Sequence, residues 1–186
     1  AGYINIGVEG QMITGAFAAT VTAIYVPLPG FLLLPLSILA GIIAGGLYAT
    51  LVAVLNMKFQ SSIVICTLML NYVANYIASY LVSYPFKDKS GDGLSLVTKT
   101  IPESTHFLQF SSSNTLNLGI VVAAVITILF FYMERKTVFG YESKMTGLNP
   151  HFAKYGGVFE KKVMLKTMAL SGAIAAVAGM CEIFGY

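Results

Sequence analysis

Residues 5–16, Asn-Ile-Gly-Val-Glu-Gly-Gln-Met-Ile-Thr-Gly-Ala, place polar groups at the start of an otherwise apolar segment. Glu9 brings a carboxylate, and Gln11 an amide, next to hydrocarbon side chains. In hydrocarbon an unpaired polar group costs several kcal/mol, and a charged side chain at a helix centre costs roughly 2.5–3.5 kcal/mol on insertion scales. Polar groups at this place in so apolar a chain therefore need a structural or functional reason. Glu9 is suited to capping a helix N-terminus, a role that is compatible with lining a pathway.

A second polar pattern runs along residues 63–84. One set, Thr67, Asn71, Asn75, Ser79 and Ser83, and a second set, Tyr72, Tyr76, Tyr80 and Tyr84, both recur every four residues. On a helix they form two neighbouring stripes, each drifting by about 40° per step. Asparagines in a membrane helix rarely face lipid, so they either bond a neighbouring helix or line a hydrated path. The path is favoured for Asn71, whereas Asn75 leaves both alternatives open.

The sequence offers no arrangement of residues typical of an enzyme. It has no nucleophile–base pattern and no metal-ligand spacing, so we expect neither a catalytic site nor a cofactor. Cys66 and Cys181 lie in apolar runs, which is typical of small core residues rather than of a disulfide framework or a CxxC site. No basic tract with interleaved aromatic residues suggests a nucleic-acid partner.

The composition is that of a membrane protein. The chain has 186 residues, of which 56% are hydrophobic and only 10% charged, against about 25% charged residues in soluble domains. Five apolar segments approach the roughly 20 residues needed to cross a bilayer, at about residues 10–26, 31–55, 63–84, 117–133 and 163–184. We expect an all-α, polytopic transmembrane helix bundle that forms a single domain over residues 1–186, with a helix broken near residues 5–11.

Lysine and arginine residues predict the orientation of the bundle. Six of them lie in the connection 134–162, whereas the three lysines of the connection 85–116 are diluted by acidic residues. The positive-inside rule places 134–162 in the cytoplasm and 85–116 outside. Alternation then places Lys58 inside and the turn at residues 27–30 outside.

Small residues predict where helices approach each other closely. They cluster in the second segment at Gly41 and residues 44–46, and in the fifth segment at residues 171–172, 175–176 and Gly179. Helices in a bilayer associate through such residues because they let the backbones approach. We expect each of these two segments to pack closely against another helix through its small-residue face.

A short helix is predicted inside the connection 134–162. Asn149 is suited to the N-cap and Pro150 to the first helical position, and Gly156 with Gly157 would end the helix about two turns later. The residues themselves leave two uses open. The helix either offers a docking surface to another protein, or binds lipid headgroups through nearby lysines.

Four motifs occur in a recognisable order. They are Asn5-Ile-Gly-Val-Glu-Gly-Gln-Met, Thr67-Leu-Met-Leu-Asn-Tyr-Val-Ala, Thr146-Gly-Leu-Asn-Pro with Tyr155-Gly-Gly, and Ser171-Gly-Ala-Ile-Ala-Ala-Val-Ala-Gly. Together they resemble the permease subunit of bacterial ABC importers of the branched-chain amino acid/ribose superfamily, and more narrowly its nucleoside and simple-sugar branch. Permeases of this family are longer than 186 residues, so we expect the chain to be a fragment, with further spans on both sides.

The sequence also departs from the family pattern at three places. Ser62 and Ile63 stand where an Asn-Glu pair is common, Lys144-Met145 replaces an Arg-Ala pair, and Ala175-Ala176 replaces Ala-Gly. These changes bear on substrate recognition more than on the fold.

The resemblance implies a transport subunit of the bacterial plasma membrane, not an enzyme. It implies cytoplasmic ATPase subunits, a second permease subunit, an extracytoplasmic solute-binding protein and the lipid bilayer as partners. The implied substrate is a nucleoside or simple sugar. Its pathway would be lined by Asn5, Glu9, Gln11, Asn71, Tyr72 and Asn75. The short helix resembles a coupling helix that docks on an ATPase, with Gly147, Asn149, Pro150, Ala153, Tyr155, Gly156 and Gly157 as the coupling residues. The alternative is a secondary transporter or channel that uses Glu9 and Glu182 as proton or ion sites.

Overall fold

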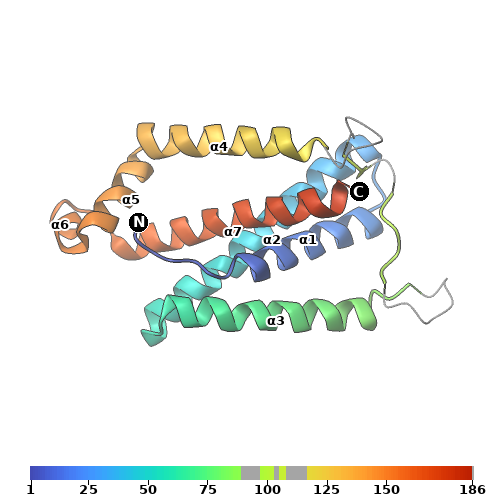
Figure 1. Ribbon diagram of the computed structural model, residues 1–186, viewed down its shortest axis with the longest axis horizontal. Helices are drawn as coiled ribbons and strands as arrows, with labels where there is room; N and C mark the ends of the chain where they lie inside the picture. Colours follow the sequence, from blue (N-terminus) through green and yellow to red (C-terminus); the bar gives the residue numbers. More distant parts are fainter. Residues whose placement is uncertain (89–96, 103–104, 108–116, 186) are drawn as a thin grey trace.

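The computed structural model describes residues 1–88, 97–102, 105–107 and 117–185. Within them the chain is all-α, as expected, and forms seven helices (Figure 1). These are α1 (Val8–Tyr25), α2 (Gly30–Phe59), α3 (Ile63–Ser83), α4 (Gly119–Lys136), α5 (Val138–Leu148), α6 (Pro150–Tyr155) and α7 (Glu160–Phe184).

Three of the described helices, α2, α3 and α7, are long and apolar enough to cross a membrane. Five spans were expected. The two expected spans that are not among these three helices are α1 and α4, with 18 residues each. The reason is local polarity. The first turn of α1 carries Glu9, followed by Gln11, and the last turn of α4 carries Arg135 and Lys136 next to Glu134.

The centre of the bundle is built from α1, α2 and α7, and α3 packs mainly against α1. The contact between α2 and α7 depends on glycine. A Cβ atom on Gly45 would lie 2.8 Å from the carbonyl oxygen of Gly172, closer than real Cβ contacts. This confirms that both small-residue faces are sites of close helix packing, because any larger residue there would separate the backbones. That the two faces meet each other was not predicted.

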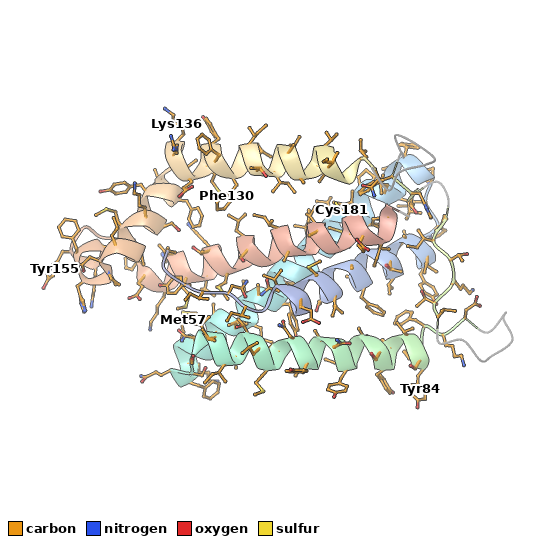
Figure 2. The ribbon with its side chains drawn as sticks, in the orientation of Figure 1. Met57, Tyr84, Phe130, Lys136, Tyr155 and Cys181 are labelled. Atoms are coloured by element: carbon orange, nitrogen blue, oxygen red, sulfur yellow. The ribbon has the colours of Figure 1, made fainter. Side chains whose placement is uncertain are left out.

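The two ends of the bundle differ in what they carry. Figure 1 shows α5, α6, the first residues of the chain and the turn between α2 and α3 at one end. The C-terminal end of α7, the turn between α1 and α2 and the end of α3 lie at the other. Lys136 and Tyr155 lie at the first end, and Tyr84 at the second (Figure 2).

Three local expectations need correction. The connection 134–162 was expected to contain one short helix, but it also contains α5, which follows α4 after Thr137, a residue whose hydroxyl accepts a hydrogen bond from Gly140 N. The polar break expected at 56–62 is shorter, because α2 continues to Phe59. Residues 5–6 are not helical, and α1 begins at Val8, so the expected break at 5–11 is the start of a helix.

Candidate functional site

The polar groups around the start of α1 form a cluster with α3 and α7. We call it the polar junction, and it consists of Asn5, Gln11, Asn71 and Ser171. The amides of Asn5 and Gln11 pair reciprocally, with Asn5 Nδ2 donating to Gln11 Oε1 at 3.0 Å and Gln11 Nε2 donating to Asn5 Oδ1 at 3.1 Å. Asn5 Nδ2 also donates to Ser171 Oγ on α7 at 2.9 Å. The junction thereby fixes the residues before α1 against α7.

Asn71 joins the same region to α3. Its Oδ1 accepts a hydrogen bond from Gly10 N at 2.9 Å, and its Nδ2 donates to the carbonyl oxygen of Ile6 at 3.0 Å. A Cβ atom on Gly10 would lie 3.1 Å from Cα of Asn71, so α1 and α3 approach closely at this point. Asn71 therefore satisfies one of the backbone N–H groups that a helix start leaves free.

These bonds show what three of the predicted pathway residues do. The side chains of Asn5, Gln11 and Asn71 are engaged with neighbouring groups of the chain. Gln11 is only 1% exposed, so it offers no surface to a solute. Asn71, for which the path was favoured, bonds to neighbouring segments and is half-buried, and its place in a pathway stays a prediction.

The other three predicted pathway residues are exposed. Glu9 lies in the first turn of α1, and its carboxylate makes no hydrogen bond to a described residue. The capping role considered for Glu9 is filled instead by Asn5, whose Oδ1 accepts from Gly7 N at 2.9 Å, and by Asn71. Tyr72 is 65% exposed, and Asn75, one turn after Asn71, is exposed as well.

Sequence reasoning missed two contributors to this region. Ser171 had been assigned only to helix packing, and a serine in a small-residue run gives no further signal. Tyr3 packs beside the buried cluster that contains Val52 and Met168, and its hydroxyl donates to Glu160 Oε1 at 3.4 Å. Partial burial first, and then the nearby Glu160 carboxylate, raise the pKa of Tyr3 to about 12.

The second candidate site is α6. Asn149 Oδ1 accepts a hydrogen bond from Phe152 N at 3.0 Å, Pro150 occupies the first helical position, and Gly157 has a positive φ of 81° after the last turn. All three features were predicted, and each has the expected physical reason: a capped start, a donor-free first residue and a left-handed exit.

The exposed surface of α6 includes two aromatic side chains, beside Pro150, His151 and Lys154. Tyr155 is 93% exposed and points away from the bundle (Figure 2). Phe152 on α6 and Phe159, which precedes α7, are also exposed. Ala153, in contrast, is only 3% exposed and packs inward, so it supports the helix rather than forming its surface. Phe152 was not among the predicted coupling residues.

Two predicted coupling glycines have local roles. Gly147, at the end of α5, lies against the backbone of residues 1–2, and a Cβ atom there would lie 3.1 Å from Gly2 N. Gly156 closes the helix by donating from its N–H to Phe152 O at 3.1 Å. The start of the chain thus contacts the α5–α6 corner at one point and the polar junction at another.

Two cavities accompany these sites. One of about 750 Å³ lies between α4, α5 and α7 and is lined mostly by apolar side chains, including Phe130, Leu170 and Ile174. Figure 2 shows Phe130 on α4, on the side of α7. Another, of about 370 Å³, lies between α1, α3 and α7 at the opposite end from α6. Among the described residues no group of three His, Cys, Asp or Glu side chains could hold a metal ion.

The comparisons with known proteins agree on one family. The family described as branched-chain amino acid transport system / permease component matches residues 1–186. The nucleoside ABC transporter permease protein NupB of Lactococcus lactis subsp. cremoris is 29% identical over 192 residues, which cover 100% of this chain and 53% of the relative. The guanosine ABC transporter permease protein NupP of Bacillus subtilis is 31% identical over 184 residues, covering 99% of this chain and 53% of the relative.

A third relative is named for glucose transport. The glucose ABC transporter permease protein TsgB13 of Haloferax volcanii is 33% identical over 193 residues, covering 100% of this chain and 51% of the relative. No solved structure matches the chain. The chain spans about half the length of these curated relatives.

The family match extends over the whole chain, and the four motifs that suggested it lie within the matched region. It confirms the predicted resemblance and identifies a permease component rather than a catalytic subunit. The chain belongs to the family of permease components of branched-chain amino acid transport systems.

Proposed function

We propose that this chain is part of the membrane-spanning permease subunit of an ATP-binding cassette importer in a bacterial plasma membrane. The observation that carries the proposal is α6, a capped helix that exposes Phe152 and Tyr155 at one end of an apolar bundle. A protein that only conducts a solute has no need of such a helix. A protein driven by a separate ATPase needs a rigid surface on which the ATPase can act.

In this proposal α1 and α4 cross the membrane together with α2, α3 and α7, so that residues 1–186 form one transmembrane domain. Eighteen residues of helix measure about 27 Å, close to the roughly 30 Å of a hydrocarbon core. The polarity at the start of α1 is compatible with a membrane, because Gln11 is buried and bonded to Asn5. The end that carries α6 is cytoplasmic, since it also carries the excess of lysine and arginine.

The proposed substrate is a nucleoside or simple sugar. Three relatives are named for nucleoside, guanosine and glucose transport, solutes that share a polyhydroxylated ring and no net charge. The exposed residues Glu9, Tyr72 and Asn75 offer acceptors, a donor and a flat ring face, which suit such a solute. Asn5, Gln11 and Asn71 act behind them by holding α1 in place.

The proposed partners are two cytoplasmic ATPases, a second permease subunit and an extracytoplasmic binding protein that delivers the solute. Closure of the ATPases would move α6, and α5 and α7 would carry this movement into the bundle as rigid elements. Phe152, Tyr155 and Phe159 are the side chains positioned to enter an ATPase groove. Aromatic anchors of this kind dominate the energetics of many protein–protein contacts.

Uptake of radiolabelled guanosine and glucose tests the proposal. Cells producing the full-length permease with its ATPase and binding protein should import at least one of these solutes. Deleting the ATPase, or replacing it with a variant that binds but does not hydrolyse ATP, should abolish this uptake. Undiminished uptake without the ATPase would contradict the proposal and favour the alternative of a secondary transporter that uses Glu9 and Glu182.

A further inference from the structure

Helix α4 is only loosely joined to the rest of the bundle. The one buried residue on it is Gly119, at its first position. The cavity of about 750 Å³ lies between α4 and α7, and a second cavity of about 430 Å³ lies between the same two helices and Ile42 of α2. The two cavities share four wall residues, Phe130, Met133, Leu170 and Ile174. They therefore adjoin, and we call them together the α4–α7 cleft.

The α7 wall of this cleft carries a seam of small side chains. Thr167, Ser171, Ala175 and Ala178 line the larger cavity and recur every three or four residues, which keeps them on one side of the helix. In a bilayer such a seam lets the backbone of another helix approach closely. The cavity separates α4 from this seam, so the seam suits a helix other than α4.

The extended residues before α1 border the same cavity, which Ala1, Gly2 and Val8 help to line. Asn5 bonds to Ser171, near the middle of the 25-residue α7, so this segment lies at membrane depth in the proposed orientation. The backbone N–H groups of residues 2–6 have no hydrogen-bond partner among the described residues. Non-helical backbone is tolerated at this depth only inside protein or beside water, so lipid alone does not suit the cleft.

Water does not suit the cleft either, because a bound water needs two to four polar partners. The hydroxyl groups of Ser143 and Thr167 are 3.3 Å apart and bond each other, and Ser171 already accepts a hydrogen bond within the polar junction. The charged wall residues, Glu134 and Lys144, lie near the end of α4 and on α5. Most of the remaining wall is apolar, and apolar protein side chains match it.

We propose that a transmembrane helix of the full-length permease, from outside residues 1–186, fills the α4–α7 cleft. About half the length of each of the three relatives lies outside the part that matches this chain, so a protein of their length has further segments available. The occupant is an apolar helix that packs between the seam of α7 and Phe130 of α4. The inference rests on the membrane location in the proposed function, and on neither the solute nor the ATPase.

Photocrosslinking of the full-length permease in its membrane tests the proposal. Phe130 is replaced by p-benzoylphenylalanine, the membranes are irradiated, and mass spectrometry identifies what the probe has bound. The expected adduct is a peptide from outside residues 1–186, in a product that migrates as a single permease chain. A phospholipid adduct, a peptide from within residues 1–186, or a product with the mass of two chains would each overturn the proposal.

Ile128 provides the matched control position. It lies on α4 and is 67% exposed, but it lines neither cavity of the cleft. The same probe at Ile128 should bind phospholipid. The same peptide adduct at both positions would contradict the assignment of the occupant to the cleft.

A second test measures whether the cleft is full. Ala178 is exposed and lines the larger cavity, so residues 1–186 alone have room for a larger side chain there. With a helix in the cleft, Ala178→Phe should lower the unfolding temperature of the full-length permease in detergent by about 5 °C, because overpacking is destabilising. Ala124→Phe is the control, since Ala124 is exposed on α4 and lines neither cavity. Equal unfolding temperatures in the two variants would overturn the proposal.

The outcomes separate this inference from the proposed function. A full-length protein that is washed from membranes by high salt would contradict the membrane location, and with it the proposed function. A membrane-embedded permease that imports neither guanosine nor glucose, yet gives the expected adduct at Phe130, would contradict the proposed function and leave the occupied cleft standing. ATP-dependent uptake together with a phospholipid adduct at Phe130 would overturn the inference alone.

Discussion

At the scale of single residues, the polar junction shows how one residue type serves two purposes. Asn71 and Asn75 lie one turn apart on α3 and have the same chemistry, yet Asn71 is bonded to the start of α1 and Asn75 is exposed. The drift of a four-residue spacing around the helix separates them. The first holds α1 against α3, and the second is exposed and stays a predicted pathway residue.

This difference predicts opposite effects for two matched substitutions. Asn71→Ala leaves Gly10 N and Ile6 O without their partner and should lower the free energy of unfolding by about 2 kcal/mol. Asn75→Ala removes no bond to a described residue and should change stability by less than about 0.5 kcal/mol, while reducing uptake. Thermal unfolding in detergent and solute uptake measure the two effects. Equal destabilisation by both substitutions would contradict the assignment.

At the scale of elements, α6 depends on its ends, because six residues supply few internal hydrogen bonds. Its cap, its proline and its closing glycine were all readable from residues 149–157, since each has a specific geometric requirement. The neighbouring helix α5 was not predicted. Its sequence contains Gly140, Gly147 and several charged residues, and its helical state depends on packing against α4, α6 and α7.

The cap of α6 gives the second prediction. Asn149→Ala should destabilise α6 by about 1 kcal/mol and reduce the amount of ATPase that co-purifies with the full-length permease. Asn149→Asp should retain most of the ATPase, because aspartate caps equally well. Thr137→Ala is the matched control, since Thr137 caps α5 in the same way but lies away from α6. An equal loss of ATPase in that control would indicate a general loss of structure.

At the scale of the whole molecule, the sequence predicted what periodicity and composition determine. The apolar segments coincide with helices to within a few residues, and the small-residue faces of α2 and α7 are sites of close helix packing, as expected. It did not predict which polar groups pair, because the partners of Asn5 and Asn71 come from segments far apart in the chain. Nor could it show that Gln11 is buried, since burial depends on how three helices are arranged around it.

The number and direction of the spans form the last prediction, and single cysteines can test it. In a variant of the full-length permease without native cysteines, Ile4→Cys, Lys58→Cys and Lys136→Cys should react with a membrane-impermeant maleimide only after permeabilisation. Leu28→Cys and Lys99→Cys should react in intact cells, because α1 and α4 each reverse the side of the chain. All five residues are exposed, so burial in the bundle does not prevent labelling. Labelling of positions 99 and 136 from the same side would show that α4 does not cross the membrane. Labelling of positions 4 and 28 from the same side would show that α1 does not cross it.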